Sequence, residues 1–277
     1  MNSNHTFTKT LGPRSAHLIT TLYENGKTIF RLKDAQAVLG LSPVSTRSFV
    51  RKLADRGIAS RIKGGLYQLV PFELGHESHF SSNPLLIGRE LMKDQSYYFS
   101  HATAMEIHGM VTQPQLVFNV SSSALHSPTV IQGIKYRFVF CKSSSFFGIT
   151  DHWVTKQEKV KVSDPERTVI DGLKQPKYCG GITEIVKGIL IQRQILNVSK
   201  LISYAVRLNV AAVNRRLGYI LETLGIGSEN DIEILRSKLP LTYSILDPVL
   251  PAEGKYLKRW GLRLNVNREE LLHVADT

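Results

Sequence analysis

The hydrophobic positions between residues 28 and 70 follow a helical period first and an alternating period afterwards. Ala35, Val38 and Leu39 recur at i, i+3 and i+4, which predicts a short amphipathic helix. Gly40 follows that helix as a residue that tolerates a left-handed C-terminal cap. The Ser42-Pro43 pair then places a capping hydroxyl before a proline at the first helical position, so a second helix is expected to begin here.

The second helix is predicted to have one apolar and one polar face. The positions that cluster on its apolar face are Thr46, Phe49, Val50 and Leu53. Because successive residues are rotated by about 100°, Arg47, Ser48 and Arg51 lie on the opposite face. Gly57 is expected to end the helix.

After residue 57 an alternating pattern predicts a two-stranded hairpin. Ile58, Ser60 and Ile62 alternate with Ala59, Arg61 and Lys63, and the chain returns over residues 66–69. Gly64-Gly65 suits a two-residue turn that needs positive φ. Pairing about this turn places Ile62 opposite Tyr67 on the inner face and Arg61 opposite Gln68, with Lys63 outside near the tip.

A helix, a tight turn, a basic helix and a basic hairpin in this order predict a winged helix-turn-helix that binds DNA. The second helix of such a module enters a major groove while the hairpin reaches the adjacent backbone. The alternative interpretation is a small helical subdomain with a solvated basic face. The residues expected to contact DNA are Ser45, Arg47, Ser48, Arg51, Lys52, Arg56, Arg61 and Lys63.

The rest of the chain predicts an α+β fold in two domains, residues 1–75 and 76–277. The winged domain is completed by a helix from residue 13 to about residue 25 and a short strand at 28–30, and residues 71–84 are interpreted as a linker. The larger domain is expected to hold a small sheet and a helical third. The expected helices are 85–92, 101–108, 182–190, 198–206 and 213–224, and the expected strands are 97–99, 116–120, 134–141, 153–154 and 159–162.

Two further features of the larger domain carry specific expectations. Ser163, with Glu166 three residues later, fits a capping box at the start of a helix whose buried face includes Val169, Ile170 and Leu173. Residues 243–266 contain two prolines and Trp260 and are expected to lie as extended chain on the domain.

The charge of the chain is concentrated where the DNA-binding pattern lies. The net charge is +12 over 277 residues, and residues 1–70 carry eleven Lys or Arg against Glu24, Asp34 and Asp55, a net charge of +8. A region this basic indicates a polyanionic partner, because neutralising phosphates releases condensed counterions. A membrane surface is a weaker alternative, because no basic amphipathic helix with a bulky apolar face is apparent.

The two cysteines and the hydropathy pattern indicate the cytoplasm. Cys141 and Cys179 match no metal-binding or disulfide spacing and are interpreted as reduced thiols. Residues 1–12 are polar, so no signal peptide is expected, and no apolar run approaches the roughly 20 residues that span a bilayer.

The motifs of common enzymes are absent, so the sequence favours a binding protein without catalytic residues, cofactor or metal. No phosphate-binding glycine loop, zinc-protease motif or nucleophile elbow occurs. His76 and His79 could bind a metal but lack a third ligand, and His101 and His108 are more simply explained as partly buried, hydrogen-bonded side chains. The cluster of Asp151, Glu158 and Lys159 invites comparison with metal-dependent nucleases, although its spacing is loose.

Several segments taken together resemble the AbiEi family, the antitoxins of bacterial abortive-infection, type IV toxin–antitoxin pairs. The resemblance rests on residues 61–67 (RIKGGLY) and 163–171 (SDPERTVID). It also takes in residues 101–109, 176–181 and 260–265, so it spans most of residues 13–266.

The resemblance implies an N-terminal winged helix-turn-helix that represses its own operon at inverted repeats. It also implies a C-terminal domain that counteracts a nucleotidyltransferase-like toxin, in the founding type without a stable toxin–antitoxin complex. No short motif carries the antitoxin function, and Asp164, Arg167, Asp171, Gly180 and Gly181 are more simply interpreted as caps and turns. The alternatives are a winged-helix regulator with a ligand-sensing second domain and a nuclease-like enzyme using residues 151–159.

Overall fold

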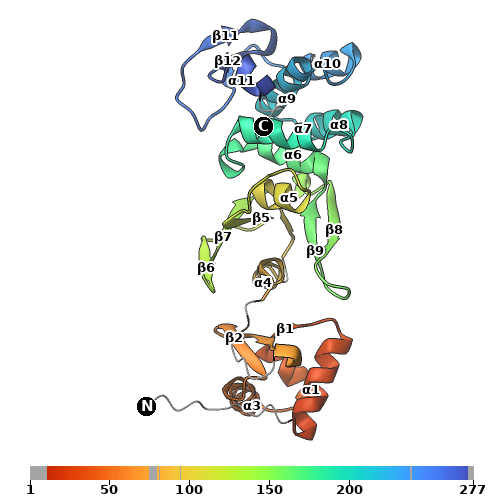
Figure 1. The fold of residues 1–277 in the computed structure, drawn as a ribbon, viewed down its shortest axis with the longest axis vertical. Helices are drawn as coiled ribbons and strands as arrows, with labels where there is room; N and C mark the ends of the chain where they lie inside the picture. The colour runs from red at the N-terminus through yellow and green to blue at the C-terminus, as the bar shows by residue number, and fades with distance from the viewer. Residues whose placement is uncertain (1–10, 75–79, 81, 94, 238, 274–277) are drawn as a thin grey trace. The chain divides into compact units, whose positions relative to one another are not determined.

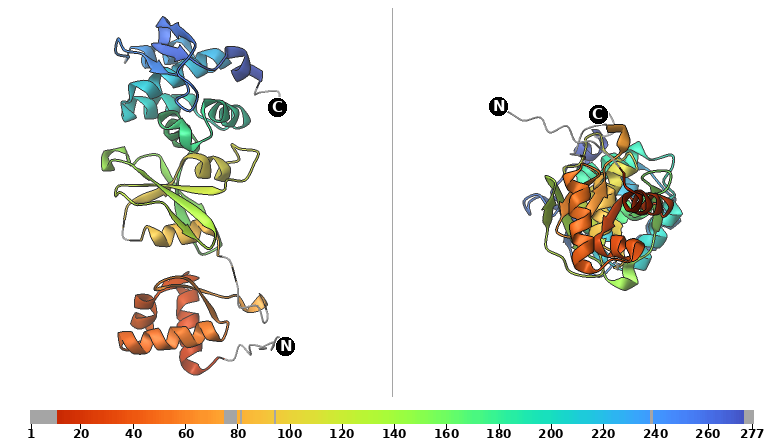
Figure 2. Two further views of the ribbon diagram at one scale, coloured as in Figure 1. Left: turned by 90° about the vertical axis from the view of Figure 1, so that its left-hand side faces the viewer. Right: turned by 90° about the horizontal axis from the view of Figure 1, so that it is seen from below.

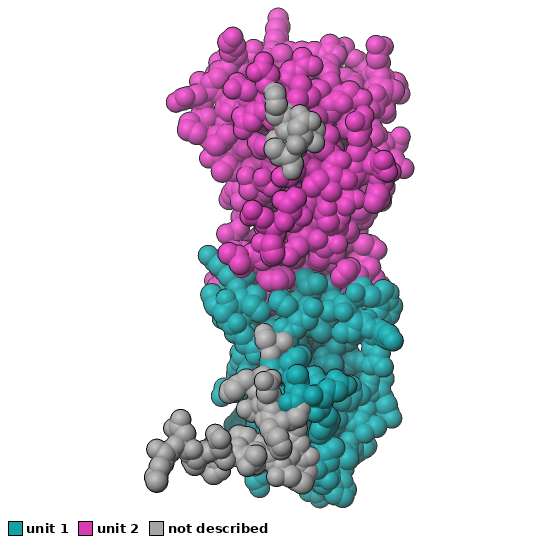
Figure 3. Space-filling view, in the orientation of Figure 1, with its two compact units in different colours: residues 1–93, 129–135, 153–160 teal, residues 94–128, 136–152, 161–277 magenta. Residues whose placement is uncertain are grey.

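The computed structural model has a mixed α+β fold and describes residues 11–74, 80, 82–93, 95–237 and 239–273. The chain divides into two compact units, which Figure 3 colours separately. The first unit comprises residues 1–93, 129–135 and 153–160, and the second comprises the remaining residues. The boundary predicted at residues 75/76 lies outside the described residues.

The N-terminal module, residues 11–70, combines three helices with a small antiparallel sheet (Figures 1 and 2). Its elements are α1 (Pro13–Glu24), β1 (Ile29–Arg31), α2 (Leu32–Leu39), α3 (Pro43–Asp55), β2 (Ala59–Lys63) and β3 (Leu66–Leu69). The strands pair in the order β1-β3-β2. Leu18, Phe30 and Leu53 lie in its hydrophobic core. Gly40 ends α2 in the left-handed region, with φ of 62°, as the sequence predicts.

The register of the β2–β3 hairpin differs from the prediction. Lys63 pairs with Leu66 across the Gly64-Gly65 turn, but Arg61, rather than Ile62, lies opposite Tyr67, and Ser60 lies opposite Gln68. An irregularity of the bulge type between Arg61 and Lys63 shifts the register by one residue. The bulge allows Ala59 and Ile62 both to be buried although their odd spacing would place them on opposite faces of a regular strand.

The remainder of the first unit is connected to the N-terminal module through the buried carboxylate of Glu158 and the backbone of Glu90. It includes α4 (Pro84–Leu91), β6 (Thr129–Ile131) and the turn that follows β8 (Ile149–Trp153). Glu158, which is 2% exposed, accepts hydrogen bonds from Thr28 Oγ1 at 2.5 Å and from Arg89 Nη2 at 2.8 Å. Arg31 donates to the carbonyl oxygen of Glu90. Segments that are distant in the sequence are thereby joined within one unit.

A six-stranded sheet contains the strands predicted at 97–99, 116–120, 134–141 and 159–162, whereas the strand predicted at 153–154 lies earlier, as β8 (Ile149–Trp153). Its order is β6-β7-β5-β4-β9-β8, and its other strands are β4 (Tyr97–Phe99), β5 (Val117–Ser122), β7 (Ile134–Phe140) and β9 (Lys159–Ser163). Strand β4 is antiparallel to β5 and parallel to β9. Helix α5 (His101–Ile107) follows β4 directly.

The helices of the second unit enclose the largest hydrophobic core cluster, which includes Ile170, Ile185, Leu217 and Trp260. The expected helices are present as α6 (Pro165–Lys174), α7 (Ile182–Ile191), α8 (Val198–Leu208) and α9 (Ala211–Leu224). Two further helices, α10 (Glu229–Arg236) and α11 (Arg268–His273), were not predicted.

Two predictions for the second unit are wrong in detail. The N-cap of α6 is Asp164, whose carboxylate accepts from the Arg167 N–H at 2.8 Å, and not Ser163. Glu166 is consequently free to bind Lys200 Nζ at 2.8 Å. The tail is not simply extended: β10 (Ser244–Ile245), β11 (Lys255–Leu257) and β12 (Leu262–Leu264) form a sheet, and Trp260 is fully buried.

Candidate nucleic-acid interface

Helix α3 presents a polar, basic face that is exposed to solvent. Ser42 caps the helix by accepting from the Ser45 N–H at 3.2 Å. Thr46, Val50 and Leu53 are at most 1% exposed, as their spacing predicts. The predicted contact residues on the other side of the helix, Ser45, Arg47, Ser48, Arg51 and Lys52, are all exposed. Arg56, at the C-cap of the helix, is half-buried.

The hairpin brings a further arginine beside this face. Arg61 and Lys63 of β2 are exposed, whereas Ile62 between them is buried. A groove of about 580 Å³ is lined by Arg47 and Arg51 from α3 and by Arg61 from β2. Asp55 and Tyr67 are also in its lining. Three predicted contact residues from two elements therefore line one depression.

Sequence reasoning missed one cation near the hairpin. The pKa of Lys63 is lowered first by partial burial and then by the positive charge of Arg31. Arg31 pairs with Leu66 at the end of β1, so the sheet places it next to the Gly64-Gly65 turn. In the sequence Arg31 directly follows the short strand predicted at 28–30, and which residue it meets depends on how that strand pairs.

The groove is suited to binding an anion. A guanidinium presents a planar fork of donors that matches the oxygens of a phosphate or the acceptor edge of guanine. Among the described residues that line the groove, three are arginines and one, Asp55, is acidic. The groove therefore carries a net positive charge.

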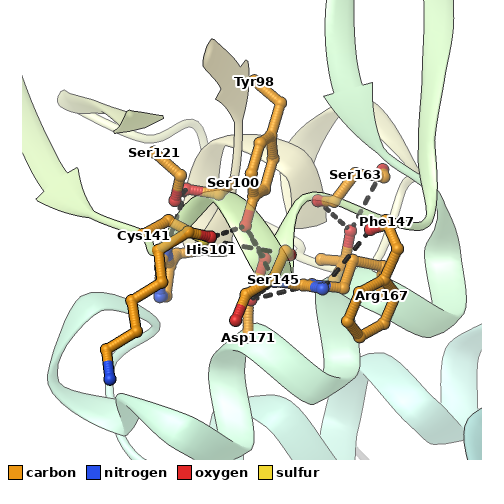
Figure 4. Close-up of polar contacts among 12 residues, drawn as sticks. Tyr98, Ser100, His101, Ser121, Cys141, Ser145, Phe147, Ser163, Arg167 and Asp171 are labelled. Carbon is orange, nitrogen blue, oxygen red and sulfur yellow. Dashed lines mark hydrogen bonds and ion pairs between the residues drawn. The ribbon is translucent and has the colours of Figure 1, made fainter. Parts of the chain in front are cut away.

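The conspicuous residues of the second unit form a buried network instead of an open site (Figure 4). Arg167 is fully buried and pairs with Asp171 at 3.0 Å. The Tyr98 hydroxyl accepts from Arg167 Nη2 and donates to Asp171 Oδ2, each at 3.0 Å. Burial, followed by the charge of Asp171, raises the pKa of Tyr98 well above its usual value. These groups satisfy one another, and this favours the structural interpretation of Arg167 and Asp171.

The carboxylates that suggested a nuclease-like site, Asp151 and Glu158, bind different partners. Asp151 pairs with Lys161 at 2.6 Å, whereas Glu158 binds Thr28 and Arg89. No group of three His, Cys, Asp or Glu side chains placed to hold a metal occurs among the described residues. His76 and His79 lie outside the described residues.

The other two histidines considered from the sequence, His101 and His108, and both cysteines lie in structural surroundings. His101 is 1% exposed and its Nδ1 lies 2.8 Å from Ser100 Oγ, and His108 Nε2 donates to the Ser163 carbonyl oxygen at 2.6 Å. Cys141 and Cys179 are buried free thiols. Within the described part of the chain, no helix has the length and apolar character to cross a bilayer.

Comparison with known proteins identifies a shared fold. No protein-family model matches the chain, and no curated protein matches it. The structure is similar to the crystal structure of the RV2827C protein from Mycobacterium tuberculosis, with a TM-score of 0.68 and 15% sequence identity. The alignment covers 100% of this chain and 99% of that one, so the likeness extends over the whole fold.

Proposed function

We propose that residues 11–70 form a winged helix-turn-helix through which the protein binds double-stranded DNA. The observation that carries the proposal is the groove that gathers Arg47, Arg51 and Arg61 from α3 and β2. In this proposal α3 enters the major groove, where arginines contact guanine edges or phosphates, and the hairpin contacts the adjacent backbone. The net charge of +8 in residues 1–70 supports a polyanionic partner.

We further propose that the protein is the antitoxin of a bacterial toxin–antitoxin pair and acts in the cytoplasm without catalysis of its own. The support for this step is the resemblance of residues 61–67 and 163–171 to AbiEi antitoxins. DNA binding at inverted repeats represses the operon, and the second unit counteracts a nucleotidyltransferase-like toxin. The proposal does not require a stable complex between the two proteins.

Binding of the full chain to the DNA upstream of its own gene tests the first proposal. Arg51→Ala is expected to weaken specific binding by about 1–3 kcal/mol, because it removes a fork of donors from the exposed face of α3. Arg14→Ala is the matched control, since it removes an exposed arginine from α1 of the same module. Wild-type affinity in the Arg51→Ala protein would show that this face does not contact the operator.

Growth of a bacterial host that expresses the adjacent gene tests the second proposal. We expect growth to stop without this protein and to recover when it is co-expressed. An Arg47→Ala/Arg51→Ala variant should still restore growth while losing repression, because neutralisation is assigned to the second unit. A harmless neighbour would exclude the antitoxin function and leave a DNA-binding regulator.

A further inference from the structure

The small sheet of the tail has one face on the core and one face open. In β12, Leu262 pairs with Leu257 of β11 and with Ser244 of β10, and both leucines pack into the hydrophobic core of the second unit. The next row across the sheet is Tyr256, Arg263 and Ile245. Because successive residues of a strand point to opposite faces, this row lies on the side away from the core. Strands β11 and β12 are labelled in Figure 1.

The open face carries two exposed tyrosine rings beside an arginine. Tyr256 is 63% exposed and Tyr243, two residues before Ile245, is 47% exposed. Their ring centroids are 5.1 Å apart with the rings nearly perpendicular, at 82°. The guanidinium of Arg263 lies 5.3 Å from the centroid of the Tyr256 ring. Large aromatic surface is thus left in water although an apolar core was available on the other side of the sheet.

The surroundings of these rings are strongly basic. Residues 255–263 contain Lys255, Lys258, Arg259 and Arg263 and no acidic residue. Lys258 and Arg259 also line, together with Tyr243, a groove of about 290 Å³. Arg259 is engaged by Glu222 at 2.7 Å, whereas Lys255 and Lys258 are exposed. The rim of the face therefore offers cations to an anionic ligand.

Two buried arginines of α9 hold this region of the tail in place from the core side. Arg215 donates to Ser244 Oγ at 2.8 Å and to the carbonyl oxygen of Pro240 at 2.9 Å. Arg216 donates to the carbonyl oxygens of Leu246 and Leu173 at 2.8 and 2.7 Å. Burial lowers the pKa of Arg216 to about 10, so the side chain stays charged at neutral pH. The buried carboxylate of Asp247 acts in the opposite direction on this pKa and partly offsets the charge of Arg216.

We propose that this open face, formed by Tyr243, Tyr256 and Arg263 with Lys258 at its rim, binds single-stranded nucleic acid. Bases stack on the exposed rings, and the cations bind the phosphates that connect those bases. A duplex does not offer its base faces in this way, so the ligand is a single strand of RNA or DNA. This function is separate from the duplex binding proposed for α3.

The size of the face favours a nucleic acid over a protein partner. Three strands of two or three residues cover an area about 10 Å wide and 10 Å long. That area accommodates the two or three stacked bases that aromatic residues on other small sheets bind. A specific protein interface needs roughly 800 Å² on each partner, which is several times larger.

Binding of labelled oligonucleotides of about 12 residues, oligo-U RNA and oligo-dT DNA, tests the proposal by fluorescence anisotropy. The full chain is used with Arg47→Ala/Arg51→Ala in the background, so that the α3 face does not contribute. Tyr243→Ala/Tyr256→Ala is expected to weaken single-strand binding at least about tenfold, because two stacking platforms are lost. Tyr243→Phe/Tyr256→Phe keeps both rings and should bind as the parent does. A preference for one oligonucleotide identifies RNA or DNA as the source of the strand.

Two results would overturn the proposal. The first is a parent protein that binds neither oligonucleotide, and the second is an alanine variant that binds as tightly as its parent. If that alanine variant instead loses an association with the product of the adjacent gene, the face is a protein interface. An unchanged melting temperature checks that the variants are folded. In the native α3 background the same variants should bind duplex normally, so failure here is distinguishable from failure of the proposed DNA-binding function.

Discussion

Three arginines of the second unit are buried, and they are stabilised in two different ways. Arg167 pairs with the carboxylate of Asp171, whereas Arg216 binds backbone carbonyl oxygens and Arg215 binds both carbonyl and hydroxyl oxygens. A guanidinium donates to several such acceptors from one rigid planar fork, which the ammonium group of lysine does not provide. Lysine is therefore not equivalent to arginine at these positions. These three arginines therefore have a structural role, while Arg47 and Arg51 of α3 are left exposed.

At the residue scale, Lys63 should report phosphate contact. Lys63→Ala is expected to weaken binding to all duplex sequences about equally and to lower the slope of log affinity against log salt concentration by about one. Lys135→Ala, which removes an exposed lysine of β7, should leave the slope unchanged. The measurement is a salt titration of DNA affinity. A slope equal to that of the wild type would remove Lys63 from the set of contact residues.

His101 should make the stability of the fold depend on pH. Its burial lowers its pKa to about 4, so it is neutral in the folded protein at pH 5, while the unfolded side chain has a pKa of about 6.5. Between pH 6.5 and 4 the unfolded state therefore binds a proton that the folded state excludes. The resulting contribution of His101 to the free energy of unfolding, about 3 kcal/mol, is fully present above pH 6.5 and is lost as the pH falls to 4.

The test of this prediction is urea unfolding at pH 7, 6 and 5 for the wild type and for His101→Asn. Asparagine cannot titrate and tolerates the positive φ of 54° at this position. The variant should lose less stability than the wild type between pH 7 and pH 5. Parallel curves for the two proteins would mean that His101 is not the group responsible.

At the element scale, the packing of α9 against the tail depends on one glycine. A Cβ at Gly218 would lie 2.1 Å from ring carbons of Trp260, which is fully buried and donates to Glu222 at 2.6 Å. Gly218→Ala should therefore displace the indole and lower the free energy of unfolding by about 1–3 kcal/mol. Gly12→Ala, where a Cβ meets nothing within 4 Å, is the control. Unchanged stability and tryptophan fluorescence in Gly218→Ala would contradict this account.

The elements that the sequence predicts correctly are those with local signals. Gly40 and Ser42 mark the ends of α2 and α3, and the spacing of Thr46, Val50 and Leu53 identifies the buried face of α3. These signals depend on propensity and period and need no knowledge of distant residues. The exposed basic face of the candidate interface could be predicted for the same reason.

The features that were missed depend on contacts between distant residues. The bulge near Ile62 is set by which side chains the core accepts, and Ser163 loses the cap of α6 to Asp164 while its hydroxyl binds Thr168 Oγ1 at 2.8 Å. The tail sheet pairs β10 with β12, 18 positions further along the chain. Strands of two or three residues are too short to carry a local pattern that predicts such pairing. The open aromatic face therefore could not be predicted from the sequence.

At the scale of the whole molecule, Glu158 joins the first unit across 130 residues of sequence. Glu158→Ala removes the acceptor of Thr28 and leaves Arg89, whose side chain is 20% exposed, without this carboxylate. We expect a loss of about 2 kcal/mol, below the usual cost for a fully buried pair. Hydrogen exchange should accelerate at residues 25–31, and Glu233→Ala, which removes an exposed pair with Arg236, should not have this effect. Unaltered exchange in Glu158→Ala would show that the contact does not stabilise the module.

The discontinuous composition of the first unit has a consequence during protein synthesis. Residues 153–160 leave the ribosome a few seconds after residue 93, at translation rates of roughly 5–20 residues per second. During that interval the nascent N-terminal module has its own core but lacks the carboxylate that binds Thr28 and Arg89. A message broken before codon 153 would therefore produce a module with a basic face but without this support, and such a product is expected to be an early target for proteolysis.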